Sequence, residues 1–231
     1  MYNAAPGTSD SALAVLTSGG LDSAILLAEA LDAHAALWPL YIRTGLAWEA
    51  VELHHLRRFL KQVARAGLQP LQILDLPVND LYGKHWSLTG NDVPDARSPD
   101  EAVFLPGRNM LLLTKSILWC HLHGVPALAL AVLKGNPFPD ATPEFFQSCQ
   151  DVVNASVGGD VRVLRPYDKL NKKEVMLRGN GLPLEWTFSC IRPQGGKHCG
   201  ACNKCEERRR GFAAAGMTDP TDYASGEACS T

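Results

Sequence analysis

The chain has 231 residues, a length that suits one large domain or one domain with a small appendage. It is 46% hydrophobic and 20% charged, as is ordinary for a soluble globular protein, and its net charge of −2 gives no general reason to expect nucleic-acid or anionic-membrane binding. The start, MYNAAPGTSD, lacks the features of a signal peptide, and no apolar run approaches the roughly 20 residues of a membrane helix. We therefore expect a cytoplasmic protein.

Strand-like and helix-like segments alternate along the chain. Their apolar patterns predict strands at residues 13–18, 34–42, 70–76, 126–133 and 161–166. They predict helices at residues 22–33, 48–67, 107–124, 142–156 and 171–181, the second ending on Gly67 as a C-terminal cap. This alternation implies right-handed parallel crossovers. The predicted fold class is therefore α/β, with a doubly wound, mostly parallel sheet and helices on both faces.

Residues 77–105 interrupt this alternation, because they are rich in turn formers and have no clear period. A loop of this length in a compact domain is usually functional or mobile. We expect one of these two roles for it.

The hexapeptide SGGLDS follows the first predicted strand, at the edge of the sheet where doubly wound folds bind ligands. Gly19 and Gly20 allow a sharp turn and a close approach to a ligand, and the next helix directs free N–H groups to the same place. The hydroxyls of Ser18 and Ser23 add donors. Asp22 would repel a bare anion, so we expect a divalent cation between it and phosphate oxygens. The alternative is a simple turn with Asp22 or Ser23 as N-cap.

Seven cysteines are present, and clustering in a cytoplasmic protein favours metal over disulfides. The C-x8-C-x2-C-x2-C spacing selects Cys190, Cys199, Cys202 and Cys205. Four converging sulfurs predict a closed, structural zinc site. An iron–sulfur cluster is the main alternative, and His198 is a competing but dispensable ligand.

The cysteines outside this cluster have other predicted roles. Cys120 and Cys149 lie on apolar helix faces, where core packing is expected. Cys229 lies near the end of the chain, and we expect no role for it. The neighbouring run Arg208, Arg209 and Arg210 is expected to form a solvated helix face near the zinc.

The hexapeptide SGGLDS resembles the SGGxDS pyrophosphate loop of the ATP pyrophosphatase superfamily, the PP-loop enzymes. The resemblance implies cleavage of ATP between the α and β phosphates and transfer of AMP to a substrate oxygen. It also implies an adenine nucleotide α hydrolase-like fold. The residues that it assigns to ATP binding are Leu16, Thr17, Ser18, Gly19, Gly20, Leu21, Asp22 and Ser23.

Together, this loop and the cysteine tail are similar to the 7-cyano-7-deazaguanine synthase family, over roughly residues 13–216. FLPGRNMLLLT resembles its V-P-x-R-N helix start, FPDATPEFF its Y-P-D-C-R-P-E-F segment, and RPYDKLNKKEV its P-L-x-x-x-T-K-x-E-I segment. WTFSC and HCGACNKCEERRRGF resemble its T-x-S-C and C-G-x-C-x-x-C-x-x-R-x-x-G-F ending. The family implies a homodimeric ligase that uses ATP, Mg²⁺ and Zn²⁺. It converts 7-carboxy-7-deazaguanine and ammonia to the nitrile, a queuosine or archaeosine precursor, through adenylated carboxylate and amide.

Within this resemblance, Asp22 is the expected Mg²⁺ ligand, and Lys172 is expected to bind charge that develops on the α-phosphate. The expected substrate-binding residues are Arg108, Asn109, Asp140 and Glu144. The alternatives for these residues are a surface arginine at a helix start, acids favoured by a helix N-terminus, and a solvated helix lysine.

The resemblance divides the chain into a PP-loop domain at 1–185, a zinc module at 186–216 and a flexible tail at 217–231. Segments 41–49 and 133–142 depart from the family pattern, near the expected position of the base. Two other functions therefore stay open: a PP-loop AMP-forming enzyme for another carboxylate or for tRNA, and a non-enzymatic zinc-binding adaptor. Near-neutral charge argues against direct nucleic-acid binding, and the intact loop argues against an adaptor.

Overall fold

The computed structural model describes residues 12–224, and its five strands form a single all-parallel sheet. The strands are β1 (Ala12–Leu16), β2 (Ala36–Arg43), β3 (Gln72–Asp75), β4 (Ala127–Ala129) and β5 (Arg162–Leu164). Their order is β3-β2-β1-β4-β5. The chain therefore winds outward in both directions from β1, and β1 and β4 meet where the strand order reverses. This confirms the predicted doubly wound α/β fold.

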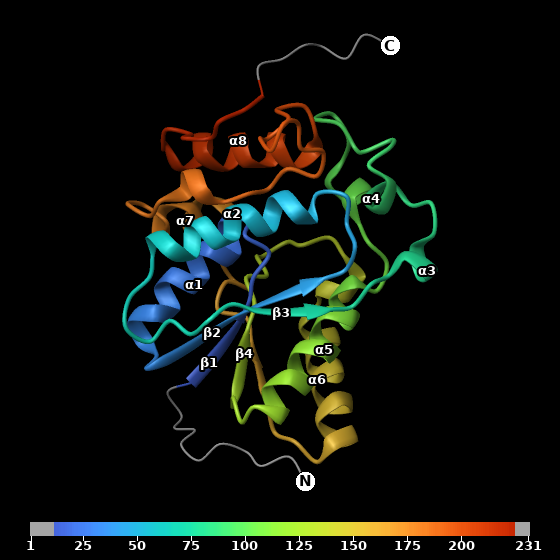
Figure 1. The fold of residues 1–231 in the computed structure, drawn as a ribbon, viewed down its shortest axis with the longest axis vertical. Helices are drawn as coiled ribbons and strands as arrows, with labels where there is room; N and C mark the ends of the chain where they lie inside the picture. Colours follow the sequence, from blue (N-terminus) through green and yellow to red (C-terminus); the bar gives the residue numbers. More distant parts are fainter. Residues whose placement is uncertain (1–11, 225–231) are drawn as a thin grey trace.

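Helices cover both faces of this sheet (Figure 1). The longer helices are α1 (Leu21–Ala33), α2 (Glu49–Gln62), α5 (Arg108–Leu122), α6 (Pro143–Val157), α7 (Lys172–Arg178) and α8 (Asn203–Ala215). The α1, α2 and α7 side shares one apolar core that includes Ile25, Leu56 and Val175. The α5 and α6 side shares a second core that includes Ile117 and Phe146, into which Cys120 packs as predicted. No helix among residues 12–224 is long and apolar enough to span a membrane.

One predicted helix end differs from the structure for a local reason. Helix α2 ends at Gln62 rather than Gly67, because the chain turns there and Arg65 donates to the Ala28 carbonyl and pairs with Asp32. Gly67 instead has φ +91° and accepts a hydrogen bond from the Leu37 N–H, which extends the edge of the sheet.

Pro39 lies inside β2 without breaking the sheet. The neighbouring edge segment pairs with β2 as an isolated bridge at Leu37–Leu68 and resumes as a ladder only at Leu40–Gln72. The proline therefore falls in a gap of the pairing on that side, where its missing N–H costs little.

The 77–105 segment is packed against the C-terminal part of the chain. It contains α3 (Asn79–Tyr82), α4 (Trp86–Thr89) and the 3-10 helix η1 (Asp100–Val103). The Asn203 N–H donates to the Pro94 carbonyl and the Ala96 N–H to the Ala201 carbonyl, at 3.0 and 2.9 Å. The segment thus forms one wall of the cysteine module.

The first part of the predicted flexible tail is also packed. The Ala224 N–H donates to the His198 carbonyl, and the Tyr223 hydroxyl donates to Asp219 at 2.7 Å. The rest of that tail, with Cys229, lies outside the described residues.

Gly179 closes α7 where this helix crosses α1. A Cβ at Gly179 would lie 2.6 Å from Ile25 Cδ1, a distance that a packed core does not tolerate, while its φ of −78° suits any residue. We expect Gly179→Ala to lower the free energy of unfolding by about 1–3 kcal/mol in urea denaturation. Asn180→Ala, at the exposed neighbouring position, is the control. Equal stability of the two variants would contradict this packing.

Candidate functional site

A cleft of about 330 Å³ opens at the carboxyl end of the sheet. Its walls come from distant parts of the chain: the loop after β1, the end of β2, and the starts of α5, α7 and α8. This is the edge, at the reversal of strand order, where doubly wound sheets bind ligands. Seven of the eight predicted ATP-binding residues line it, and Gly19 does not; the seven are Leu16, Thr17, Ser18, Gly20, Leu21, Asp22 and Ser23.

The glycine loop has the conformation that an anion-binding turn requires. Gly19 has φ +76°, and a Cβ there would lie 3.2 Å from the Leu56 Cβ, so both the conformation and the packing favour glycine. Gly20 is the N-cap of α1, and no side chain caps the helix. The alternative of an N-cap at Asp22 or Ser23 is therefore not what the structure shows, and the α1 start faces the cleft.

The serines hold this loop together from within. The Ser18 N–H donates to Ser23 Oγ at 3.3 Å, and the Ser23 hydroxyl lies 3.2 Å from the Gly20 carbonyl oxygen, to which it donates. A further bond joins the loop to the C-terminal part of the chain, because the Phe188 N–H donates to the Gly19 carbonyl at 2.8 Å. Phe188 and Ser189 consequently line the cleft beside the loop.

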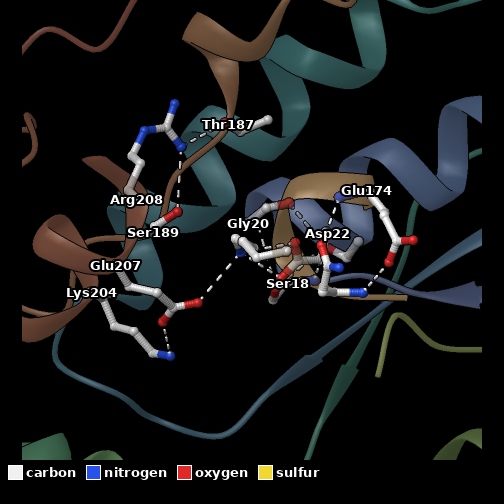
Figure 2. Close-up of polar contacts among 12 residues, drawn as sticks. Ser18, Gly20, Asp22, Glu174, Thr187, Ser189, Lys204, Glu207 and Arg208 are labelled. Atoms are coloured by element: carbon white, nitrogen blue, oxygen red, sulfur yellow. Dashed lines mark hydrogen bonds and ion pairs between the residues drawn. The ribbon is translucent and has the colours of Figure 1, made fainter. Parts of the chain in front are cut away.

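Four charged side chains form a chain of alternating sign along the cleft wall, which we call the charge chain. Lys172 Nζ lies 2.9 Å from both carboxylate oxygens of Asp22 and 3.4 Å from Glu207 Oε1. Lys204 Nζ lies 2.5 Å from the other oxygen of Glu207. Figure 2 shows Glu207 on α8 reaching toward the loop, with the Lys204 ammonium turned to its carboxylate. The structure thus brings together the two predicted catalytic residues, which come from α1 and α7.

Contacts within the charge chain shift the pKa values of Lys172 and Glu207. Burial opposes the charged form of Lys172, but attraction to Asp22 and Glu207 outweighs it and raises the pKa of the lysine. Burial likewise opposes ionisation of Glu207, yet Lys204 and Lys172 lower the pKa of this carboxyl to about 2. The ion pair between Lys172 and Glu207 therefore favours the charged form of both side chains.

Lys172 is placed by the start of its helix. Asn171 is the N-cap of α7, and its side chain accepts a hydrogen bond from the Glu174 N–H, while the Glu174 carboxylate accepts one from the Asn171 N–H. This reciprocal capping box fixes the first turn. The lysine backbone is thus held firmly at the edge of the cleft.

The predicted substrate-binding residues divide into two groups. Arg108 and Asn109 line the cleft at the start of α5. The Arg108 Nε is buried and has no hydrogen-bond partner among the described residues, so the guanidinium has donor capacity to spare. Asp140 is buried and accepts from the Asn109 N–H at 3.0 Å, and Glu144 is exposed outside the cleft. Their role in substrate binding stays a prediction, while the contact shows Asp140 holding Asn109.

The cleft also contains Glu52, which the sequence reasoning missed. Glu52 is buried and accepts a hydrogen bond from the Tyr41 hydroxyl at 2.6 Å. Burial raises the pKa of Glu52 to about 7, although the Tyr41 hydroxyl and nearby Arg108 favour the charged form. Its signal in the sequence was an acid on the apolar face of a predicted helix. Lys204 and Glu207 were missed because they lie among the cysteines.

The four predicted metal ligands converge. The sulfurs of Cys190, Cys199, Cys202 and Cys205 lie within 4.8 Å of one another, and all four residues are buried. The N–H groups of Arg192 and Cys199 each donate to Cys190 Sγ at 3.3 Å. Such bonds favour the thiolate form that metals bind. A closed four-sulfur set fits a structural zinc ion.

His198 is buried beside this cluster but takes another role. Its Nε2 lies 3.1 Å from the Ser189 N–H, which donates to it, so the imidazole holds the segment leading to Cys190. The predicted dispensability of His198 as a ligand agrees with this contact.

Arg208 corrects the prediction that the basic run forms a solvated face. Only 1% of Arg208 is exposed, and its guanidinium donates to the Leu184 carbonyl at 2.9 Å and to Thr187 Oγ1 at 2.8 Å. Figure 2 shows this side chain turned toward Thr187 and Ser189. Arg210 remains exposed. A buried charge is tolerated because its donors are satisfied.

Comparison with known proteins agrees with this geometry. The model of the family "Queuosine biosynthesis protein QueC" matches residues 12–216. A 7-cyano-7-deazaguanine synthase from Thiobacillus denitrificans is 31% identical, with 91% of this chain and 97% of the relative covered. One from Syntrophotalea carbinolica is 32% identical, with coverages of 91% and 95%. The resemblance identified from the sequence is confirmed.

A similar fold occurs in a 4-thiouridine synthetase solved in complex with RNA and ATP. Its TM-score to this chain is 0.50 at 16% sequence identity, covering 93% of this chain and 53% of that one. At this identity the similarity concerns the fold alone.

The raised pKa of Glu52 predicts a pH-dependent stability. The folded state binds the Glu52 proton more tightly than the unfolded state, whose pKa is near 4.5, so this carboxyl lowers the free energy of unfolding as pH rises from about 4.5 to 7. Glu52→Gln removes that loss. We expect the variant to gain stability over wild type across this window, by up to about 3 kcal/mol.

Urea denaturation at several pH values between 4.5 and 8 measures this effect. Glu144→Gln, at an exposed position, controls for the substitution itself. A difference between Glu52→Gln and wild type that does not grow with pH would show that Glu52 is not held in an apolar environment.

Proposed function

The chain belongs to the family of the queuosine biosynthesis protein QueC, and from this premise we propose that it is an ATP-dependent carbon–nitrogen ligase that makes 7-cyano-7-deazaguanine. Its substrates would be 7-carboxy-7-deazaguanine, ammonia and ATP. The observation that carries the proposal is the cleft lined by the glycine loop, Lys172 and Arg108, whose buried Nε has no hydrogen-bond partner among the described residues. A loop for phosphates and a cation for a carboxylate are what adenylation requires.

The reaction consists of two activations. A carboxylate oxygen attacks the α-phosphorus of ATP and pyrophosphate leaves, then ammonia attacks the carbonyl carbon and AMP leaves, which yields the amide and a proton. The amide oxygen then attacks the α-phosphorus of a second ATP, and pyrophosphate leaves as the nitrogen loses one proton. The C–O bond to AMP breaks as the nitrogen loses its second proton, which leaves the nitrile and AMP. In both activations, negative charge develops on the α-phosphate of the ATP that reacts.

The residues near the loop have matching roles. The backbone of Gly19 and Gly20 and the start of α1 bind the phosphates that leave as pyrophosphate. The Lys172 ammonium stabilises charge at the α-phosphate. The Asp22 carboxylate lines the cleft and is the type of oxygen ligand that Mg²⁺ prefers. When bound, Mg²⁺ would neutralise phosphate charge. Lys172 and Mg²⁺ would compete for Asp22, because both carboxylate oxygens contact the lysine.

The opposite wall would hold the base. The Arg108 guanidinium suits the substrate carboxylate, since its planar fork binds carboxylates bidentately. Asn109, held by Asp140, offers an amide beside it. Water exclusion around the acyl-adenylate is aided by Phe188 and Trp48, two of the apolar side chains of the cleft.

The four cysteines would hold Zn²⁺ in a structural role. The N–H donors to sulfur and the closed set of ligands support zinc over a catalytic metal. Zinc bound there would stabilise the fold through the thiolates and would supply no group to the reaction.

The working form in our proposal is a cytoplasmic homodimer that acts on small molecules and makes no direct contact with nucleic acid or membrane. Family membership supports the dimer, and the net charge of −2 supports the absence of a polyanion partner.

One assay tests the reaction. The protein is incubated with ATP, Mg²⁺, ammonia and 7-carboxy-7-deazaguanine, and AMP and the nitrile are measured by mass spectrometry. We expect both products from the wild type and neither from Asp22→Ala, because the variant loses the acid that faces the phosphates. The matched control is Asp32→Ala, on the same helix, where an exposed acid pairs with Arg65 at little energetic value.

The outcomes separate the candidate functions. AMP without nitrile would indicate another PP-loop enzyme, and no AMP with any carboxylate would indicate the adaptor. An active and folded Asp22→Ala variant would rule out the Asp22 assignment.

Metal analysis tests the cysteine site. We expect about one zinc per chain, as one closed four-sulfur site implies. Cys202→Ser should lose the metal and lower the thermal midpoint together, because metal binding is linked to folding. Cys149→Ser, a thiol outside the cluster, should keep its zinc. An iron absorbance spectrum in the wild type would favour the cluster instead.

A further inference from the structure

Lys172 pairs with two carboxylates rather than one. Asp22 holds its ammonium from the side of the glycine loop, and Glu207 holds it from α8. The Lys172 side chain is 24% exposed, and the two acids are 26% and 31% exposed, so all three lie in the cleft wall. The proposed function uses Asp22 and Lys172 and leaves the second acid unexplained.

Glu207 matters when Asp22 and Lys172 separate. Phosphate binding has to draw the lysine from Asp22, and a lysine with no other partner would then sample many rotamers of its long side chain. Glu207 on α8 remains in contact with the Lys172 ammonium. The ammonium therefore stays anchored on that side while it turns from Asp22 to the phosphate. Fixing a charged group before reaction lowers the cost of stabilising charge in the transition state.

Glu207 is itself held at a fixed place. Its second oxygen pairs with Lys204, three residues earlier on α8. Helix α8 begins at Cys202, which is its N-cap, so two of the four clustered cysteines lie in the same turn as Lys204. The position of Glu207 is therefore set by the cysteine module.

The geometry points to Glu207 as a positioning residue of the ATP site, which acts on the reaction only through Lys172 and is oriented by Lys204. This inference rests on the proposed function for the role of Lys172. Simple charge counting predicts the opposite effect, because removal of an acid makes the cleft more attractive to an anionic nucleotide.

The first test needs no substrate. Full-length protein is treated with limiting acetic anhydride, and acetylation of Lys172 is followed by mass spectrometry. Glu207→Gln should raise the labelling rate of Lys172 severalfold, because its ammonium loses an anchor, and should leave the exposed neighbour Lys173 unchanged. Glu206→Gln is the matched control, since Glu206 lies on the same helix at 34% exposure, paired with Arg209. Unchanged labelling of Lys172 in Glu207→Gln would overturn the inference.

The second test is a double-mutant cycle in the rate of AMP formation. Glu207→Gln should slow the rate about tenfold or more, and should cause no further loss in a Lys172→Ala background. Glu207→Asp, which keeps the charge, should recover part of the rate. Additive losses, or a faster Glu207→Gln enzyme, would overturn the positioning role. Thermal midpoint and zinc content should match wild type.

The two tests distinguish a failure of the proposed function from a failure of the inference about Glu207. If the wild type forms no AMP, the proposed function fails, and the labelling of Lys172 still decides whether Glu207 anchors it. If AMP forms but the cycle is additive, only the inference about Glu207 fails.

Discussion

The cleft depends on the hydrogen bonds of one buried group, the guanidinium of Arg208. A charge in the interior has to be fully hydrogen-bonded, and Arg208 meets this requirement with groups from the segment just before Cys190 and with Thr221. That segment carries Phe188, whose N–H reaches the glycine loop. A single satisfied charge thereby joins α8, the cysteine module and the ATP loop. Replacing its partners would leave the charge without compensation, which is far more costly than the loss of a surface pair.

The sequence predicted those parts of the molecule in which a local pattern has one structural meaning. Apolar runs bounded by turns became the five strands, SGGLDS became a turn at the ligand-binding edge, and the C-x2-C spacings brought sulfurs together. Local patterns failed at Gly67. This glycine was predicted to end a helix, but its carbonyl accepts a hydrogen bond from Leu37 at the edge of the sheet. Arg208 shows the same limit, since the tertiary contacts that bury it come from residues about twenty positions away.

The charge chain lay beyond sequence reasoning for a related reason. Asp22, Lys172 and Glu207 are 150 and 35 residues apart along the chain, and no periodicity links such positions. The same holds for Glu52, where the signal was an acid on an apolar face and its partner Tyr41 came from a neighbouring strand. Tyr41 and Trp48 belong to 41–49, one of the two segments that depart from the family pattern, and both line the cleft. This departing segment thus contributes to the wall of the cleft, while the glycine loop on the other side keeps the pattern.

The bond between the Phe188 N–H and the Gly19 carbonyl has a consequence for biosynthesis of the chain. Its two ends are 188 − 19 = 169 residues apart, so at about 5–20 residues per second the ribosome needs roughly 10–30 s to add the second after the first. Until then the first strand and its loop can form, but the wall supplied by residues 186–208 does not exist. The cleft therefore acquires its full set of walls only after residues 186–208 have been synthesised.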